Sequence, residues 1–176
     1  MPTPLPFDLE WVSSLVATRT EASTAFFQAC TWLGEVEGYV LIVAAIHVAF
    51  DKGLAIRLAV VALTTMSANH VLKTWIANPR PFVALGTHEA NWAVSPAKAA
   101  ELAAEYSTPS GHAMAGASFY GALVGWARSL PIRFLAITAI VLLGVSRPVL
   151  GVHYVEDILL GWGLGGLAAV VAIRFG

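Results

Sequence analysis

The chain has 176 residues, of which 57% are hydrophobic and 12% are charged, with a formal net charge of -1. Its mean hydropathy is +0.72, and because soluble domains usually carry about a quarter charged residues, this composition predicts an integral membrane protein. The near-neutral charge without a basic run argues against a nucleic-acid-binding protein, and the length predicts a single domain over residues 1–176.

The N-terminal part of the chain is predicted to lie on the membrane surface. Residues 8–30 place apolar side chains such as Leu9 and Val12 at helical spacing among polar ones. This pattern is typical of an amphipathic helix, or helices, in the membrane interface, and a sixth, weakly hydrophobic span is the alternative. We therefore divide the domain into a surface segment, residues 1–30, and a helical core, residues 31–176.

Five apolar segments of the core are predicted to be transmembrane helices, so the fold class is an all-α membrane helical bundle. The second segment stops at residues 78–81, because proline removes a backbone donor and restrains the residue before it. Gly121 with Gly125, and Gly161 with Gly165, have the four-residue spacing that lets membrane helices approach closely. The five segments cover residues 35–50, 54–76, 110–127, 132–146 and 153–174.

The connections between these segments are uneven in length and charge. Residues 82–108 form a long polar connection with an alanine-rich, helical piece over residues 96–105, and loops of this length are usually functional or disordered. Cytoplasmic helix ends collect basic residues. We expect a multi-pass protein of the plasma (inner) membrane, and this rule predicts that its opposite helix ends face the periplasm or exterior. The basic residues that set this orientation are Lys52, Arg57, Arg128, Arg133 and Arg174.

Polar clusters from four distant parts of the sequence fall at the outer ends of the predicted spans. Charged side chains are costly within a membrane and usually mark a function. Guanidinium groups and the free amides of helix starts suit a group with several negative oxygens, of which a phosphoryl group fits best. Snorkelling toward lipid headgroups explains a lone interfacial arginine, but hardly four clusters. The clusters are Lys73 with Arg80-Pro81, Pro109-Ser110-Gly111-His112, Ser146-Arg147, and His153 with Asp157.

Two histidines in these clusters are candidates for acid–base and nucleophilic chemistry. His153 and Asp157 are four residues apart, so they share a face if a helix begins near Val152. The carboxylate then accepts a hydrogen bond from one ring nitrogen and leaves the other free to attack. His112 stands at the start of another helix, where it is a candidate to protonate a leaving alkoxide.

The complete arrangement resembles the three-part motif of the type 2 phosphatidic acid phosphatase superfamily, which is shared with the vanadium haloperoxidases. Its parts are Lys73-(six residues)-Arg80-Pro81, then Pro109-Ser110-Gly111-His112, then Ser146-Arg147-(five residues)-His153-(three residues)-Asp157. Many membrane relatives have six spans, so the first thirty residues are the departure from the family pattern.

The resemblance implies a catalytic mechanism in which His153 attacks phosphorus and forms a phosphohistidine, with Asp157 orienting it. His112 would protonate the leaving oxygen and later deprotonate water. No metal and no other cofactor is implied. The resemblance also implies that the phosphoryl oxygens are held by Lys73, Arg80, Ser110, Gly111 and Arg147.

We therefore expect a metal-independent hydrolase of a lipid phosphate or lipid diphosphate, of the phosphatidylglycerophosphate, phosphatidate or isoprenyl diphosphate class. A vanadate-dependent oxidant is a rival, but such relatives are typically soluble. A second rival is a membrane carrier that binds phospholipid headgroups without cleaving them. The presence of His112, His153 and Asp157 favours hydrolysis, because binding alone needs neither a nucleophile nor an acid.

Overall fold

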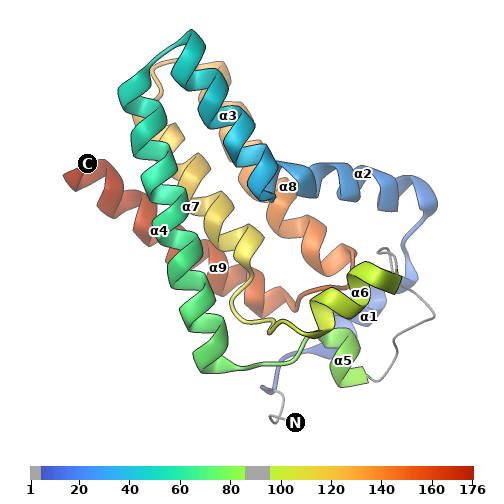
Figure 1. Cartoon of the computed structure of the whole chain (residues 1–176). Coiled ribbons are helices and arrows are strands. Elements are labelled where there is room, and N and C mark those ends of the chain that lie inside the picture. The colour runs from blue at the N-terminus through green and yellow to red at the C-terminus, as the bar shows by residue number, and fades with distance from the viewer. Residues whose placement is uncertain (1–4, 86–95) are drawn as a thin grey trace.

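The computed structural model describes residues 5–85 and 96–176, and every regular element in these ranges is a helix (Figure 1). The predicted all-helical fold is therefore confirmed for this part of the chain. The elements are α1 (Leu9–Ala17), α2 (Glu21–Thr31), the short 3-10 helix η1 (Trp32–Gly34), α3 (Val36–Ala49), α4 (Lys52–Ile76), α5 (Pro81–Leu85), α6 (Pro96–Ala103), α7 (Gly111–Trp126), α8 (Leu130–Val149) and α9 (Val155–Phe175).

Three of the described helical segments are long and apolar enough to cross a membrane: Lys52–Ala84, Leu130–Val149 and Val155–Phe175. A fourth is present if α2 with η1 and the following α3 are taken together as one span that bends by 57°. α7 is shorter, with 16 residues. Each of the five predicted segments thus corresponds to a helix, in the predicted order, while the number that cross the membrane stays a prediction.

α7 is the central helix of the bundle. It packs against α4, α8 and α9, and Figure 1 shows it between them. Its residues from Ala113 to Tyr120, and Ala122, are buried. A helix that is apolar all round belongs in an interior rather than at a surface, so α7 carries its N-terminal residues, including His112, into the middle of one end of the bundle.

The two glycine pairs predicted to allow close helix packing lie in the contact between α7 and α9, each pair against other residues of the opposite helix. A Cβ atom at Gly161 would lie 2.9 Å from Ala113 Cβ and 3.0 Å from the carbonyl oxygen of Ser110. A Cβ atom at Gly121 would lie 3.0 Å from Ala169 Cβ, and one at Gly165 would meet the backbone of Met114. The close approach holds the start of α9 against the start of α7, where the site residues lie.

Replacing Gly165 with alanine is expected to lower the thermal unfolding midpoint in detergent, because the new methyl group meets a backbone carbonyl that cannot move aside. Overpacking of this kind costs about 1–3 kcal/mol. Gly163→Ala is the matched control, since nothing lies within 4 Å of a Cβ atom there. A Gly165→Ala protein as stable as the Gly163→Ala protein would contradict the packing described here.

The N-terminal segment forms two helices joined by a break at residues 18–20. Thr20 is the N-cap residue of α2. Its side chain accepts from the N–H of Ser23, and the Ser23 side chain accepts from the N–H of Thr20. The chain before α1 is fixed to the end of the bundle where α9 begins: the N–H of Leu5 donates to Asn78 Oδ1 at 2.9 Å and that of Asp8 to Glu156 Oε1 at 3.0 Å. Both α1 and α2 also contact α8.

Two elements differ from the prediction: α8 is longer than predicted, and α5 was not predicted. α8 continues to Val149, three residues past the predicted 146, and includes Pro148 in its last turn. The chain then turns at Gly151, whose φ of 74° suits glycine. α5 is an unpredicted helix with Pro81 at its first position. Its Phe82 is fully buried in a small core with Leu102, Leu150 and Val152.

Candidate active site

The four predicted clusters meet at one end of the bundle around a cavity of about 190 Å³. α4, the α4–α5 connection, α7, α8 and the α8–α9 connection each supply at least one side chain, so residues far apart in the sequence converge as predicted. The cavity is lined by Lys73, Arg80, Gly111, His112, Arg147 and His153 together with Glu35, Lys98, Glu101, Leu102 and Glu105.

His153 and Asp157 form the predicted pair at the start of α9. His153 Nδ1 lies 3.2 Å from Asp157 Oδ2, and both residues are buried. His153 Nε2 lies 3.0 Å from Arg80 Nη1. Because a guanidinium group only donates, Nε2 must accept and Nδ1 must carry the proton that it donates to the carboxylate. The unprotonated nitrogen, Nε2, therefore faces Arg80.

His153 is held in its neutral form. Burial first, and then the positive charge of Arg80, lower the pKa of His153 well below its usual value of 6.5. A histidine with a lowered pKa is neutral above that pKa and becomes protonated only when the pH falls through it. The ring nitrogen consequently keeps its electron pair at neutral pH, as nucleophilic attack requires.

Arg80 contacts the candidate nucleophile, His153, and also lines the cavity. Its Nη1 also donates to the carbonyl oxygen of Val152 at 3.0 Å, and its Nη2 donates to Glu105 at 2.9 Å. The residue is 1% exposed, so its guanidinium group is fixed in place by these contacts. A phosphoryl group at this position would receive hydrogen bonds from a preorganised fork.

Asp157 accepts hydrogen bonds from residues to which the sequence analysis gave no role in the site. The hydroxyls of Ser107 and Thr108 and the N–H of Tyr154 all donate to its carboxylate. Asn78 in turn donates to Thr108 Oγ1 at 2.8 Å. Asn78 lies two residues before Arg80, and Ser107 and Thr108 lie directly before Pro109. This proximity to the predicted motif is the signal that could have identified them.

The sequence analysis also gave no role to Glu105, which contacts two cations of the site, Arg80 and Lys73. Its Oε2 lies 2.9 Å from Arg80 Nη2 and 3.8 Å from Lys73 Nζ, and its side chain is 54% exposed. A carboxylate between a guanidinium and an ammonium group uses donors that also suit a phosphoryl group. A bound phosphoryl group would therefore have to displace Glu105 from these two cations.

Glu105→Gln is accordingly expected to strengthen inhibition by inorganic vanadate, because the anion no longer competes with a carboxylate. The inhibition constant should fall by about fivefold, the factor that corresponds to a partly exposed ion pair worth about 1 kcal/mol. Glu101→Gln is the control, since Glu101 pairs with Lys98 at 2.9 Å and changes the net charge equally. Equal changes in both variants would show a general charge effect rather than competition at Arg80 and Lys73.

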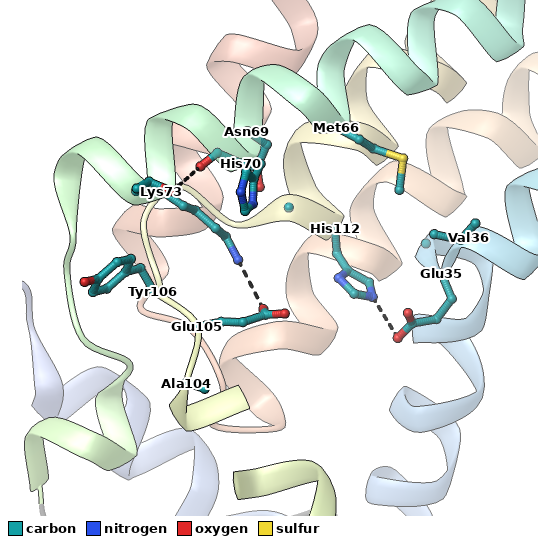
Figure 2. Close-up of a pocket in the computed structure, with 13 residues that line it drawn as sticks. Glu35, Val36, Met66, Asn69, His70, Lys73, Ala104, Glu105, Tyr106 and His112 are labelled. Atoms are coloured by element: carbon teal, nitrogen blue, oxygen red, sulfur yellow. Dashed lines mark hydrogen bonds and ion pairs between the residues drawn. The ribbon is translucent and has the colours of Figure 1, made fainter. Parts of the chain in front are cut away.

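His112 lines the same cavity as His153. Its Nε2 lies 3.2 Å from Glu35 Oε1, as Figure 2 shows. Figure 2 also shows Lys73 and Glu105 on the side of His112 away from Glu35. These residues line a second cavity, of about 410 Å³, as well as the smaller one, so the two cavities adjoin.

Arg147 is buried at the end of α8, and its Nε has no hydrogen-bond partner among the residues that the structure describes. It lines the same cavity as Lys73 and Arg80. The cavity thus contains a buried cation with unused donor capacity, which suits an anionic group with several oxygens.

Ser110 and Gly111 begin α7, as predicted, but they differ in position. Ser110 is buried and caps the helix, its side chain accepting from the N–H of Ala113 at 3.5 Å, and it is absent from the residues that line the two cavities. Gly111 lines both cavities, close to Asn69, whose side chain donates to the carbonyl oxygen of Pro109. Phosphoryl contacts from Ser110 and Gly111 stay a prediction.

The sequence model of the PAP2 superfamily matches residues 54–176 of this chain. The match covers more than half of the chain and includes all three parts of the motif. The chain therefore belongs to the PAP2 superfamily, and the resemblance predicted from the motif is confirmed.

Individual relatives agree with this assignment. Phosphatidylglycerophosphatase B of Bacillus subtilis (strain 168) is 35% identical over 106 residues, which are 55% of this chain and 45% of that protein, so the chain spans about half of that relative's length. The structure is similar to the crystal structure of a transmembrane PAP2-type phosphatidylglycerolphosphate phosphatase from Bacillus subtilis, with a TM-score of 0.77, 25% identity, and coverage of 95% of this chain and 83% of that one. Aquifex aeolicus LpxE has the same fold, with a TM-score of 0.77, 20% identity, and coverage of 96% and 95%.

Proposed function

We propose that this protein is a lipid phosphatase that hydrolyses a lipid phosphate or lipid diphosphate through a phosphohistidine. The observation that carries the proposal is the placement of His153 Nε2, unprotonated and next to Arg80, in a cavity shared with three further cations, Lys73, Lys98 and Arg147, and with His112. The names of the two Bacillus subtilis relatives support a phospholipid phosphate as substrate. Phosphatidylglycerophosphate, phosphatidate and isoprenyl diphosphates are the candidate classes.

In the proposed first step, His153 Nε2 bonds to phosphorus while the bond to the leaving oxygen breaks and His112 gives that oxygen a proton. In the second step, His112 takes a proton from water as the water oxygen attacks phosphorus and the bond to His153 breaks. Asp157 holds the His153 ring in the reactive tautomer in both steps. Lys73, Arg80 and Arg147 would stabilise the negative charge on the phosphoryl oxygens, with Gly111 and Ser110 at the start of α7 as further phosphoryl contacts.

The lipid part of the substrate has a candidate position between α3 and α4. An apolar groove of about 420 Å³ runs along these helices from Val36 and Met66 to His47 and Val48. Val36 and Met66 also line the larger cavity beside His112, so the groove continues into the site. A headgroup at the cations would leave its hydrocarbon chain in an apolar channel that opens sideways, as a substrate held in a bilayer requires.

We further propose that five helices, α3, α4, α7, α8 and α9, cross the plasma (inner) membrane, with α1 and α2 on its surface and the site facing the periplasm or exterior. Four of the basic residues lie at or next to the α3–α4 turn, the α7–α8 turn and the end of α9: Lys52 begins α4, Arg128 lies between α7 and α8, Arg133 is in the first turn of α8, and Arg174 is near the end of α9. Figure 1 shows these turns at the end of the bundle away from α5 and α6. Basic residues mark cytoplasmic ends, which puts the site on the other side.

Cysteine labelling in intact cells tests this orientation. In a Cys30→Ala background, a cysteine placed at exposed Ala100 in α6 should react with a membrane-impermeant maleimide, and one at exposed Ser129 should react only after the membrane is opened. The opposite pattern would invert the orientation and assign the substrate to the cytoplasmic leaflet.

The proposed function is tested by phosphate release from a panel of lipid phosphates and diphosphates with the purified protein in detergent. Hydrolysis should continue in the presence of a chelator and be inhibited by vanadate, which mimics the five-coordinate phosphorus of the transition state. Binding of these lipids without phosphate release would favour the non-hydrolytic carrier. Inactivation by the chelator that magnesium reverses would require a different mechanism.

A further inference from the structure

Glu35 lies outside the residues matched by the superfamily, 54–176, and outside the motif, yet it contacts His112. We infer that Glu35 is the positioning residue for His112, so that the site contains a second histidine–carboxylate pair in addition to His153 and Asp157. This inference rests on the proposed function and assigns one more residue to it.

The direction of the Glu35 side chain is the first reason. Glu35 occupies the N-cap position of α3, but its side chain makes no capping hydrogen bond there. Its carboxylate reaches His112 Nε2 instead, at 3.2 Å. The neighbouring acidic residue, Glu37, lies in the first turn of α3 and is exposed. Glu35 is therefore the carboxylate of this turn that is directed into the site.

The backbone around Glu35 is fixed against α7, which is the second reason. Tyr120 of α7 donates to the carbonyl oxygen of Leu33 at 2.8 Å. A Cβ atom at Gly34 would lie 2.8 Å from His112 Cδ2 and 2.8 Å from Leu143 Cδ2, so only glycine lets the chain pass this close to the imidazole ring. Together these contacts hold Glu35 beside His112 before any substrate binds.

The hydrogen bond also decides which nitrogen of His112 serves the reaction. A carboxylate only accepts, so His112 Nε2 carries a proton in both charge states of the ring. Figure 2 shows the other nitrogen directed away from Glu35, toward the side where Lys73 and Glu105 lie. In the first step the Nδ1 proton would pass to the leaving oxygen as the phosphorus–oxygen bond breaks, and in the second step Nδ1 would take the proton of the attacking water.

Dependence on the leaving group tests this inference. The carboxylate stabilises the imidazolium that donates a proton, so Glu35→Gln should lower kcat/KM for a lipid alkyl phosphate, whose alkoxide leaves poorly without a proton. We expect a loss of about tenfold or more, part of the 10²–10⁴-fold that general acids supply. The kcat/KM for p-nitrophenyl phosphate should change by less than about twofold, because its leaving phenolate needs no proton in the transition state.

Three further variants separate positioning from folding. Glu37→Gln removes the same charge from the same turn and should change neither rate. Glu35→Asp keeps the charge on a shorter chain and should recover part of the alkyl phosphate rate. In a His112→Asn background, Glu35→Gln should add little further loss, because the residue through which Glu35 acts is gone.

Each other outcome overturns a stated part of the proposal. Equal losses on both substrates, or an undiminished loss in the His112→Asn background, would make Glu35 structural. Full activity of the Glu35→Gln enzyme on the alkyl phosphate would remove its role while leaving the proposed function intact. Absence of wild-type hydrolysis of both substrates would overturn the proposed function, and the role of Glu35 with it.

Discussion

Replacing His153 with asparagine is expected to abolish hydrolysis of lipid phosphates, because the atom that would bond to phosphorus is removed. Loss of the nucleophile in a well-studied hydrolase lowers kcat by about 10⁶-fold, and we expect a loss of that order. The measurement is phosphate release at saturating substrate, where a low affinity cannot be mistaken for slow chemistry.

Folding and anion binding should survive in the His153→Asn protein. His153 is 1% exposed, and an asparagine amide can still accept from Arg80. Vanadate binding, followed by its effect on the unfolding midpoint, should therefore remain close to that of the wild type. Substantial hydrolysis by this variant would move the nucleophile to another residue.

Replacing Asp157 with asparagine is expected to lower kcat by about 10⁴-fold, the loss observed when a buried carboxylate that orients a catalytic histidine is made neutral. In the wild type, Asp157 Oδ2 accepts from His153 Nδ1, which leaves Nε2 without a proton. An amide group at this position can donate to Nδ1, and it would then favour the tautomer that protonates Nε2. The loss should appear in kcat rather than in KM.

Glu156→Gln is the matched control for Asp157→Asn. Glu156 is the adjacent acidic residue, but it accepts from the backbone of Asp8 on the outside of the bundle and should affect activity little. The unfolding midpoint must be compared as well, because Asp157 also accepts from Ser107, Thr108 and the N–H of Tyr154. An Asp157→Asn enzyme with the wild-type rate would exclude the orienting role.

The helices and the convergence of the site were predictable because they rest on local signals. Long apolar segments predict the helices, and the turn residues at 51–53 and 78–81 predict where two of the helices end, so the order of the helices follows from the sequence. Once the helices alternate in direction, Lys73, His112 and His153 must share one end. The two glycine pairs predicted close helix packing without naming the partner helices, and the structure places both pairs in the contact between α7 and α9.

The two carboxylates that contact the candidate site residues were not predictable, for a physical reason. Glu35 and Glu105 belong to sequence contexts in which acidic residues are usually solvated. Glu35 reaches His112 only because the chain bends by 57° between α2 and α3 and Gly34 allows close contact. Glu105 reaches Arg80 only because α5 and α6 fold back over the end of the bundle, as Figure 1 shows. Both contacts depend on tertiary packing that no local pattern encodes.

The measurement that tests the central claim most directly is trapping of the phosphoenzyme. The wild-type protein is mixed with a lipid phosphate labelled with radioactive phosphorus, quenched in alkali within one turnover and digested. We expect an alkali-stable, acid-labile label on the peptide that contains His153, and no label in the His153→Asn protein. Label on a different residue, or hydrolysis in the wild type without any labelled protein, would contradict a phosphohistidine at His153.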